Sequence, residues 1–242
     1  MSRLLYFRHA QASYGKADYD QLSPQGYKQS ELLGEHLAQQ KVHFDHLYIG
    51  PLKRHYQTLS KVQEAYAKYN LPLPDPIELL ELEEHRGPDI LKSSMVQIKN
   101  EDELIKKWDD ERKKDQSLQV KNGLLIFERA MTLWATGRLT HLQPEEYLDW
   151  PQFRKQVASG YEQVYNRHKD QKGLTIGLFT SGGTISATLG HVLGMSSDEN
   201  IIGLNGVVQN TSVSEFLFSG ERVTMKRFND VSHLPEDMKT YV

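Results

Sequence analysis

The feature that most constrains the fold is a mostly apolar run at residues 174–180, which reads LTIGLFT. Such runs are typical of strands buried on both faces of a parallel sheet. The turn Ser181-Gly182-Gly183 follows at once, and apolar spacing then continues to residue 193, which predicts a helix starting where the strand ends. A glycine turn between a strand and a helix N-terminus can bind anions. We therefore predict an α/β fold with a ligand site at the carboxyl ends of its strands.

Two further strand–helix units precede this run. Residues 4–7 (LLYF) form a short buried strand that ends in Arg8-His9, and Ser23-Pro24 predicts the start of a helix over 24–40. A second strand over 44–49 leads through Gly50-Pro51 into a helix over 52–69. An antiparallel hairpin is predicted over 213–228. Together these units predict a three-layer αβα fold with a mostly parallel sheet.

The middle of the chain has a different character. Charged residues dominate 99–116, and Trp108, Trp134 and Trp150 lie in segments with the spacing of amphipathic helices. We predict a helical insertion at about 90–160 that covers the active site, within a single domain spanning 1–242. Its charged runs are expected to form solvent-exposed helix faces.

The overall charge and the cysteine content limit the function classes. A net charge of −3 with both signs interspersed predicts neither a nucleic-acid partner nor a membrane partner. There is no cysteine, so disulfides and thiolate catalysis are excluded. The start of the chain does not have the pattern of a signal peptide, and we expect a cytoplasmic protein. The ten histidines show no HExxH spacing, so we predict no metal site and no cofactor.

His9 is the candidate nucleophile. A neutral imidazole is nucleophilic near pH 7 when its second nitrogen is held by a hydrogen bond. Arg8 offers a planar fork of donors for phosphate oxygens, and Arg54 lies near the start of the helix after the second strand, facing the same sheet edge. Backbone donors at Ser181 and Gly182 add positive potential. The sequence therefore predicts a site for phosphoryl transfer.

These segments resemble the histidine phosphatase superfamily, which includes the phosphoglycerate mutases. The resemblance rests on Arg8-His9-Ala10, on the segments 11–15 (QASYG) and 20–29 (DQLSPQGYKQ), and on 50–58 (GPLKRHYQT). It covers roughly residues 3–90 and 174–235. It implies a phosphoglycerate-mutase-like fold in which His9 is phosphorylated during turnover and Arg8 and Arg54 bind the phosphate.

The resemblance also implies an acidic residue that protonates the leaving group. The segment 81–87 (ELEEHRG) is similar to the family's Leu-x-Glu region, and this register favours Glu84. Glu81 and Glu83 remain alternatives, because all three carboxylates lie in the same segment. An acidic turn without a catalytic role is the competing interpretation.

Position 181 departs from the family pattern. The family has a second histidine before the glycine pair, whereas this chain has Ser181, which can bind a phosphate oxygen but carries no positive charge. The loss of one preorganised donor can cost about 3–4 kcal/mol of transition-state stabilisation. His85 and His233 are candidates for an auxiliary cation. Gln11 and Ser13 can either bind phosphate or cap the loop after His9.

The motif residues and the family resemblance are compatible with three functions. The leading expectation is a metal-independent phosphatase that hydrolyses phosphomonoesters through a phosphohistidine on His9. Its partner is a phosphorylated small molecule or a phosphoprotein, and its oligomeric state is open. A phosphate-binding or interaction protein without turnover is the alternative, motivated by Ser181. A phosphoglycerate mutase is less favoured, because the chain has Arg-His-Ala and lacks the second histidine at position 181.

Overall fold

The computed structural model describes residues 1–13, 20–139 and 147–241. One six-stranded sheet runs through it in the order β3-β2-β4-β1-β5-β6. The first four strands in this order are parallel, and β5 and β6 are antiparallel to their neighbours. The strands are β1 Ser2–Arg8, β2 His46–Ile49, β3 Pro76–Glu78, β4 Thr175–Thr180, β5 Val213–Ser219 and β6 Arg222–Asp230. The predicted mostly parallel sheet and the predicted hairpin are confirmed.

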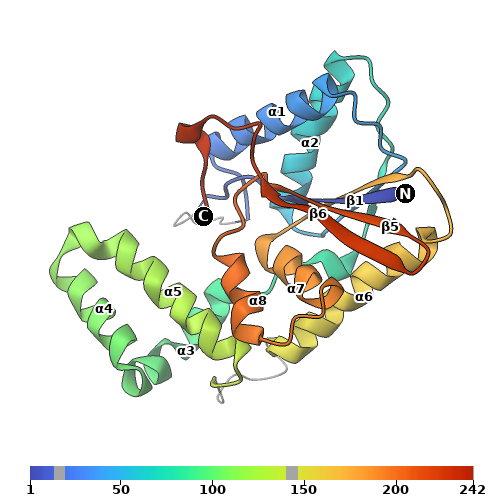
Figure 1. The fold of residues 1–242 in the computed structure, drawn as a ribbon. Helices are drawn as coiled ribbons and strands as arrows, with labels where there is room; N and C mark the ends of the chain where they lie inside the picture. The colour runs from blue at the N-terminus through green and yellow to red at the C-terminus, as the bar shows by residue number, and fades with distance from the viewer. Residues whose placement is uncertain (14–19, 140–146, 242) are drawn as a thin grey trace.

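Helices cover both faces of the sheet (Figure 1). The helices α1 and α2 pack on one face, where Leu5 and Phe7 of β1 join their core. The helices α6 and α7 pack on the other, where Leu4 and Tyr6 join a second core. Alternate residues of β1 thus serve opposite layers, as the pleat of a strand requires. These helices span Pro24–Gln39 (α1), Lys53–Lys68 (α2), Trp150–His168 (α6) and Gly182–Val192 (α7).

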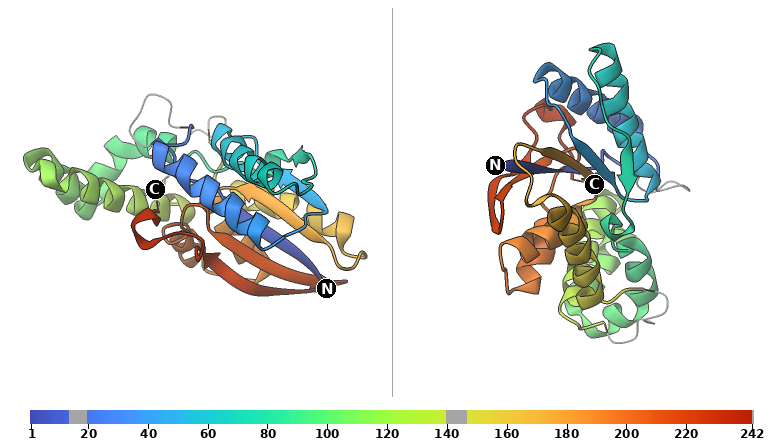
Figure 2. Two further views of the ribbon diagram at one scale, coloured as in Figure 1. Left: turned by 90° about the horizontal axis from the view of Figure 1, so that it is seen from above. Right: turned by 90° about the vertical axis from the view of Figure 1, so that its right-hand side faces the viewer.

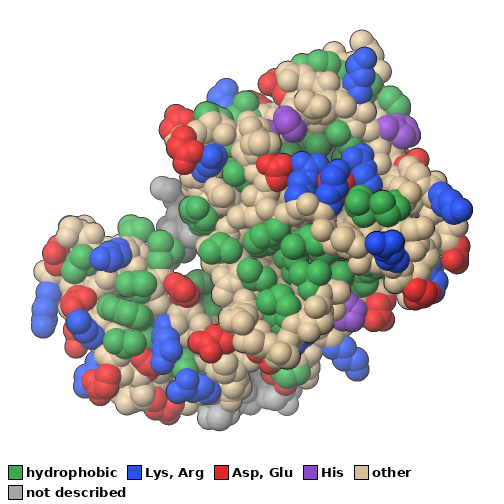
Figure 3. All heavy atoms as spheres, in the orientation of Figure 1, with side chains coloured by type: hydrophobic (Ala, Val, Ile, Leu, Met, Phe, Trp, Pro, Cys, Tyr) green, Lys and Arg blue, Asp and Glu red, His purple; other side chains and the backbone are tan. Residues whose placement is uncertain are grey.

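A third core lies at the end of the sheet opposite the N-terminus. It joins α3 (Gly87–Glu101), α4 (Glu103–Lys114) and α5 (Gln119–Ala135) to the first half of α6 and to α8 (Asp198–Asn205). Figure 2 shows α3, α4 and α5 projecting from this end of the molecule. We call these three helices the cap. Its surface mixes positive, negative and hydrophobic side chains (Figure 3).

The sequence-based elements agree with the structure to within a few residues. The helices predicted at 24–40 and 52–69 are α1 and α2, and Ser23 caps α1 by accepting from the backbone N–H of Gly26 at 3.0 Å. Two elements were not predicted, the short strand β3 and the helix α8. The division of the chain into a domain and an insertion remains a prediction. Among the described residues, no helix is long and apolar enough to cross a membrane.

Candidate active site

The carboxyl ends of β1, β2 and β4 meet at one edge of the sheet, below the cap. A cavity of about 390 Å³ opens there. Arg8, His9 and Arg54 lie at its sheet end, and Glu84 and His85 line its side. The cap, α8 with the adjoining Gly206, and Tyr241 near the C-terminus supply the remaining wall. Its apolar members are Pro88, Leu124, Phe127, Met131 and Ile202, and its polar members include Glu128, Thr132, Asn205 and the hydroxyl-bearing Tyr241.

His9 has the geometry of a nucleophile. Its Nδ1 lies 2.7 Å from the carbonyl oxygen of Ala10, which assigns the proton to Nδ1 and leaves the lone pair on Nε2. Arg54 donates from Nε to this Nε2 at 3.1 Å. Burial, followed by the charges of Arg54 and Arg8, holds the pKa of His9 well below its usual value. The imidazole is therefore neutral at pH 7, with the Nε2 lone pair that a nucleophile needs.

The two arginines are held by neighbouring groups. Arg54 donates from its guanidinium to Asp20 Oδ1 at 2.8 Å, and Asp20 also accepts from the backbone N–H of Lys53 at 2.9 Å. Arg8 donates to the carbonyl oxygen of Val208. Both side chains are nearly buried, yet both line the cavity. Two guanidinium groups fixed in this way can bind a phosphate dianion in a defined orientation.

The loop after His9 is fastened by side chains of the motif segments. Thr58 accepts from the backbone N–H of Ala10 at 3.1 Å, and Gln29 accepts from that of Gln11 at 2.9 Å. The side chain of Gln11 accepts from Ser23 at 2.7 Å. The backbone N–H of Ser13 donates to Gln21, at 2.8 Å. These contacts fit the loop-capping interpretation of Gln11 and Ser13, and neither is among the described residues that line the cavity.

The three candidate acids are separated by the structure. Glu84 lines the cavity, and its carboxylate accepts from the backbone N–H of Gly183 at 2.8 Å. Glu81 accepts from Gln163 and lies with Glu83 on a different surface groove beside α6. Only Glu84 of the three faces His9 across the cavity. The geometry therefore supports Glu84 as the proton donor.

The end of β4 is arranged differently from the sequence-based expectation. Ser181 is fully buried, and neither Ser181 nor Gly182 is among the described residues that line the cavity, although both were predicted to bind phosphate. The N-terminus of α7 is also engaged, because Gly183 gives its backbone N–H to Glu84. A Cβ at Gly182 would lie 3.4 Å from Arg8 Nε and 2.5 Å from Asn205 Oδ1. The glycine pair thus lets Arg8, Asn205 and Glu84 approach the helix end.

The two auxiliary histidines lie in different places. His85 lines the cavity, 3.5 Å from Glu84 and 3.4 Å from Asn205, and burial lowers its pKa. His233 lies outside the cavity, where its Nε2 is 3.0 Å from the hydroxyl of Thr211 and burial lowers its pKa to about 4. The structure thus brings His85 to the site, but not His233. Both are expected to be neutral at pH 7.

Three residues of the site were missed by the sequence analysis. Asn205 comes from the unpredicted helix α8. Asp20 lies within a motif segment, but its contact with Arg54 follows only from the fold. His55 is fully buried, 2.7 Å from the Ser181 hydroxyl, with its ring centroid 5.8 Å from that of His9. The sequence signal for His55 was its position directly after Arg54. Both residues lie in the first turn of α2, so the histidine also lies near the site.

Comparison with known proteins identifies the family and the fold. The family model of the histidine phosphatase superfamily (branch 1) matches residues 4–134 and 126–231. A search of curated proteins found no match. Solved structures with the same fold include a phosphoglycerate mutase from Bacillus anthracis, with 15% sequence identity, 96% and 94% of the two chains covered and a TM-score of 0.60.

Two other solved structures are similar over nearly their whole lengths. A phosphoserine phosphatase variant from Entamoeba histolytica, in complex with phosphoserine, shares 14% identity over 97% of this chain and 100% of its own, with a TM-score of 0.60. YhfR from Bacillus stearothermophilus shares 15% identity over 96% and 99%, with a TM-score of 0.65. At these identities the structures show the shared fold, and the family model covers most of the sequence. The chain therefore belongs to the histidine phosphatase superfamily.

Proposed function

We propose that the protein is a metal-independent phosphatase that hydrolyses phosphomonoesters through a phosphohistidine on His9. The observation that carries this proposal is the neutral, buried His9 imidazole, which lines the cavity, accepts from Arg54 at Nε2 and donates from Nδ1 to a backbone carbonyl. This arrangement fixes the tautomer that nucleophilic attack requires. The positive charge that phosphoryl transfer needs comes from Arg8 and Arg54.

The reaction takes place in two steps. In the first, Nε2 of His9 attacks phosphorus, the bond to the ester oxygen breaks, and protonated Glu84 gives its proton to that oxygen. In the second, water attacks the phosphohistidine, Glu84 takes a proton from the water, and the phosphorus–nitrogen bond breaks. Inorganic phosphate leaves, while His9 is neutral and Glu84 protonated again. One carboxyl group thus acts first as acid and then as base.

The cavity wall favours a small substrate with an apolar leaving group. A cavity of 390 Å³ lies within the size range of small-molecule sites, and α5 turns Leu124, Phe127 and Met131 toward it. Glu128 is the charged group that the cap adds to this wall. It would repel a carboxylate on the leaving group, such as that of a phosphoglycerate. We therefore propose aryl and alkyl phosphates as the preferred class.

The test compares phosphate release from p-nitrophenyl phosphate, an alkyl phosphate and 3-phosphoglycerate, with and without chelator. We expect release that persists in chelator, is weakest for 3-phosphoglycerate, and is lost in His9→Ala. The matched control is His43→Ala, because the His43 side chain is exposed, with 67% of its surface accessible. Acid-labile phosphate on the wild type during turnover identifies the intermediate. Release that is lost in chelator would contradict the metal-independent mechanism.

The alternative function is phosphate binding without turnover. Two observations favour it: Ser181 carries no charge, and the backbone donor of Gly183 is engaged by Glu84. If this function is the right one, inorganic phosphate binds to the wild type with an affinity that depends on Arg8 and Arg54, while no ester is hydrolysed and no phosphohistidine forms. Titration calorimetry with inorganic phosphate, beside the release assay, separates the two functions.

A further inference from the structure

His55 and Ser181 form a buried pair directly beside the candidate nucleophile. Both side chains are inaccessible to solvent, and His55 Nε2 lies 2.7 Å from Ser181 Oγ. Arg8 and Thr180 are register partners on the adjacent strands β1 and β4, so the next position along both strands places Ser181 beside His9. The His55 ring completes this group, 5.8 Å from the His9 ring and tilted by 39° to it.

The surroundings of His55 show that the fold makes room for its ring. The ring lies against Gly50, at the end of β2, where a Cβ would come within 2.6 Å of His55 Nδ1 and 2.7 Å of the carbonyl oxygen of Leu82. Any side chain at position 50 would therefore displace the imidazole or the segment that leads to Glu84. The His55 imidazole is therefore closely packed between Gly50 and Ser181, and a larger side chain at either position would displace it.

We propose that His55, held by Ser181, is a positioning residue for His9, and that it supplies from α2 the second imidazole that the sequence analysis found missing at position 181. This inference rests on the proposed function. The ring of His55 supports one side of the His9 imidazole, while Arg54, the preceding residue, contacts its Nε2 at 3.1 Å. Two consecutive residues of α2 thus fix the orientation of the nucleophile.

The electrostatic properties agree with a positioning role. Burial, followed by the charge of Arg54, lowers the pKa of His55 to about 3, so the ring is uncharged at pH 7. The neutral ring does not replace the positive charge of a histidine at position 181, and it does not compete with Arg8 and Arg54 for the phosphate. Its contribution is to hold the His9 ring in place. The rate of phosphoryl transfer depends on the orientation of the nucleophile, so a well-placed ring reacts faster.

The test is a double-mutant cycle at positions 55 and 181. His55→Ala alone leaves a space beside His9, and we expect the rate of phosphohistidine formation to fall about 10- to 100-fold. Ser181→His alone places a second ring where His55 already lies, and we expect a similar loss through overpacking. The combined His55→Ala/Ser181→His variant restores one imidazole in that space. We expect it to form phosphohistidine at least ten times faster than either single variant.

Controls separate positioning from general damage to the fold. His55→Gln keeps a hydrogen-bond donor for Ser181 and is expected to retain more activity than His55→Phe. His168→Gln is the matched control, because His168 is another buried histidine bound to a hydroxyl, that of Tyr48 at 2.9 Å, and it lies outside the cavity lining. We expect it to leave the rate unchanged. The KM for p-nitrophenyl phosphate should stay within about threefold in all these variants, because Arg8 and Arg54 are intact.

The outcomes are distinguishable. A combined variant as slow as the product of the two single losses, in folded protein with unchanged KM, overturns the positioning role of His55 while leaving the proposed function intact. Absence of phosphohistidine in the wild type overturns the proposed function and this inference with it. If a single variant does not fold, the rates of His55→Gln and Ser181→Ala decide: wild-type rates in both would contradict the inference.

Discussion

The two ends of β1 carry the same residue type in two different settings. Arg3 and Arg8 are each register partners of a threonine on β4, Thr175 and Thr180. At the amino end, Arg3 donates to the Thr175 hydroxyl at 3.0 Å and lies 3.7 Å from the carboxylate of Glu215. At the carboxyl end, Arg8 lines the cavity beside His9. The position along the strand, rather than the residue type, separates an arginine in an ion-pair network from one that lines the cavity.

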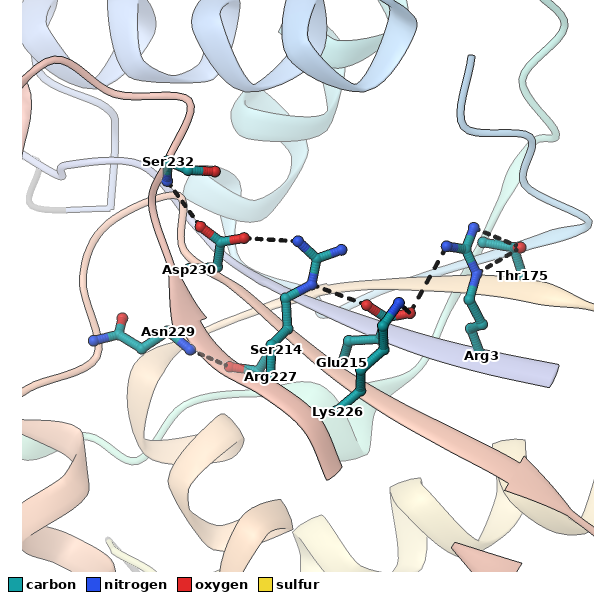
Figure 4. Close-up of polar contacts among 9 residues, drawn as sticks. All are labelled: Arg3, Thr175, Ser214, Glu215, Lys226, Arg227, Asn229, Asp230 and Ser232. Atoms are coloured by element: carbon teal, nitrogen blue, oxygen red, sulfur yellow. Dashed lines mark hydrogen bonds and ion pairs between the residues drawn. The ribbon is translucent and has the colours of Figure 1, made fainter. Parts of the chain in front are cut away.

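The amino-end network is centred on one buried carboxylate. Glu215 of β5 is inaccessible to solvent and is approached by three cations, Arg3, Lys226 and Arg227 (Figure 4). Arg227 also donates to Asp230 at 2.6 Å. The charges of this network therefore compensate one another within the sheet. At the carboxyl end the arginines instead face a cavity that a phosphate can enter, and this contrast gives the following tests.

The largest effect is expected at the arginines themselves. Arg8→Lys loses the planar fork, and we expect kcat/KM to fall about 10³-fold, whereas Arg3→Lys should stay within about threefold. Inorganic phosphate should raise the melting temperature of the wild type and of Arg3→Lys, but hardly that of Arg8→Lys. Steady-state kinetics and thermal unfolding measure both. Equal losses in the two variants would show that the two ends of β1 do not differ in function.

The next effect concerns stability. Glu215→Gln leaves Arg3, Lys226 and Arg227 without their buried counter-charge, and we expect a loss of about 3 kcal/mol in the free energy of unfolding. The kcat of the folded fraction should not change. Glu221→Gln is the control, because the Glu221 side chain is 84% exposed and its ion pair with Lys169 should contribute less than about 1 kcal/mol. Urea unfolding of both variants checks the difference.

A smaller effect is expected at Glu84, the proposed proton donor. Glu84→Gln removes the acid in the cavity, and we expect kcat for alkyl phosphates to fall about 100-fold. The loss for p-nitrophenyl phosphate should be much smaller, since its leaving group needs little protonation. Glu81→Gln, outside the cavity, should match the wild type for both esters. If kcat falls in Glu81→Gln, and falls more for alkyl phosphates than for p-nitrophenyl phosphate, then Glu81 rather than Glu84 is the proton donor.

The smallest effect, taken per pH unit, is a pH dependence of stability. Burial lowers the pKa of His55 to about 3 and that of His168 to about 4, so both are neutral in the folded protein. The unfolded chain binds these protons below about pH 6.5, and stability is therefore lost as the pH falls from about 6.5 toward 4. Each such proton adds at most about 1.4 kcal/mol per pH unit to the slope, and solvent screening makes the share of His168 smaller than that. Chemical unfolding at several pH values should show a shallower slope in His168→Gln than in the wild type.

Most of the fold was predictable because local sequence patterns determine its strands and helices. The runs at 4–7 and 174–180, and the start of α1 at Ser23-Pro24, combine apolar spacing with turn residues that allow few alternatives. The short strand β3 was missed because three residues carry no period, and two of them, Ile77 and Glu78, are exposed. The helix α8 was missed because its amphipathic signal is weak and only Ile201 and Ile202 of it are buried.

The candidate site could be predicted only in part. Arg8, His9 and Arg54 follow strands or open a helix at one sheet edge, so their meeting follows from topology. The hydrogen bonds that these residues make could not be predicted from topology, because they depend on how loops and side chains pack at that edge. Residues 14–19 and 140–146 lie outside the described residues, and these include the last two residues of the predicted motif segment QASYG.

The close approach of Gly50 to His55 has a consequence for the variation of the sequence. A chain with histidine at position 55 needs glycine at 50 to accommodate the ring and a small residue at 181 to receive it. A chain with histidine at 181 has no space for a ring at 55 and is released from the requirement at 50. Substitutions at these three positions are therefore expected to occur together in evolution, so that among relatives a change at one of them predicts the state of the other two.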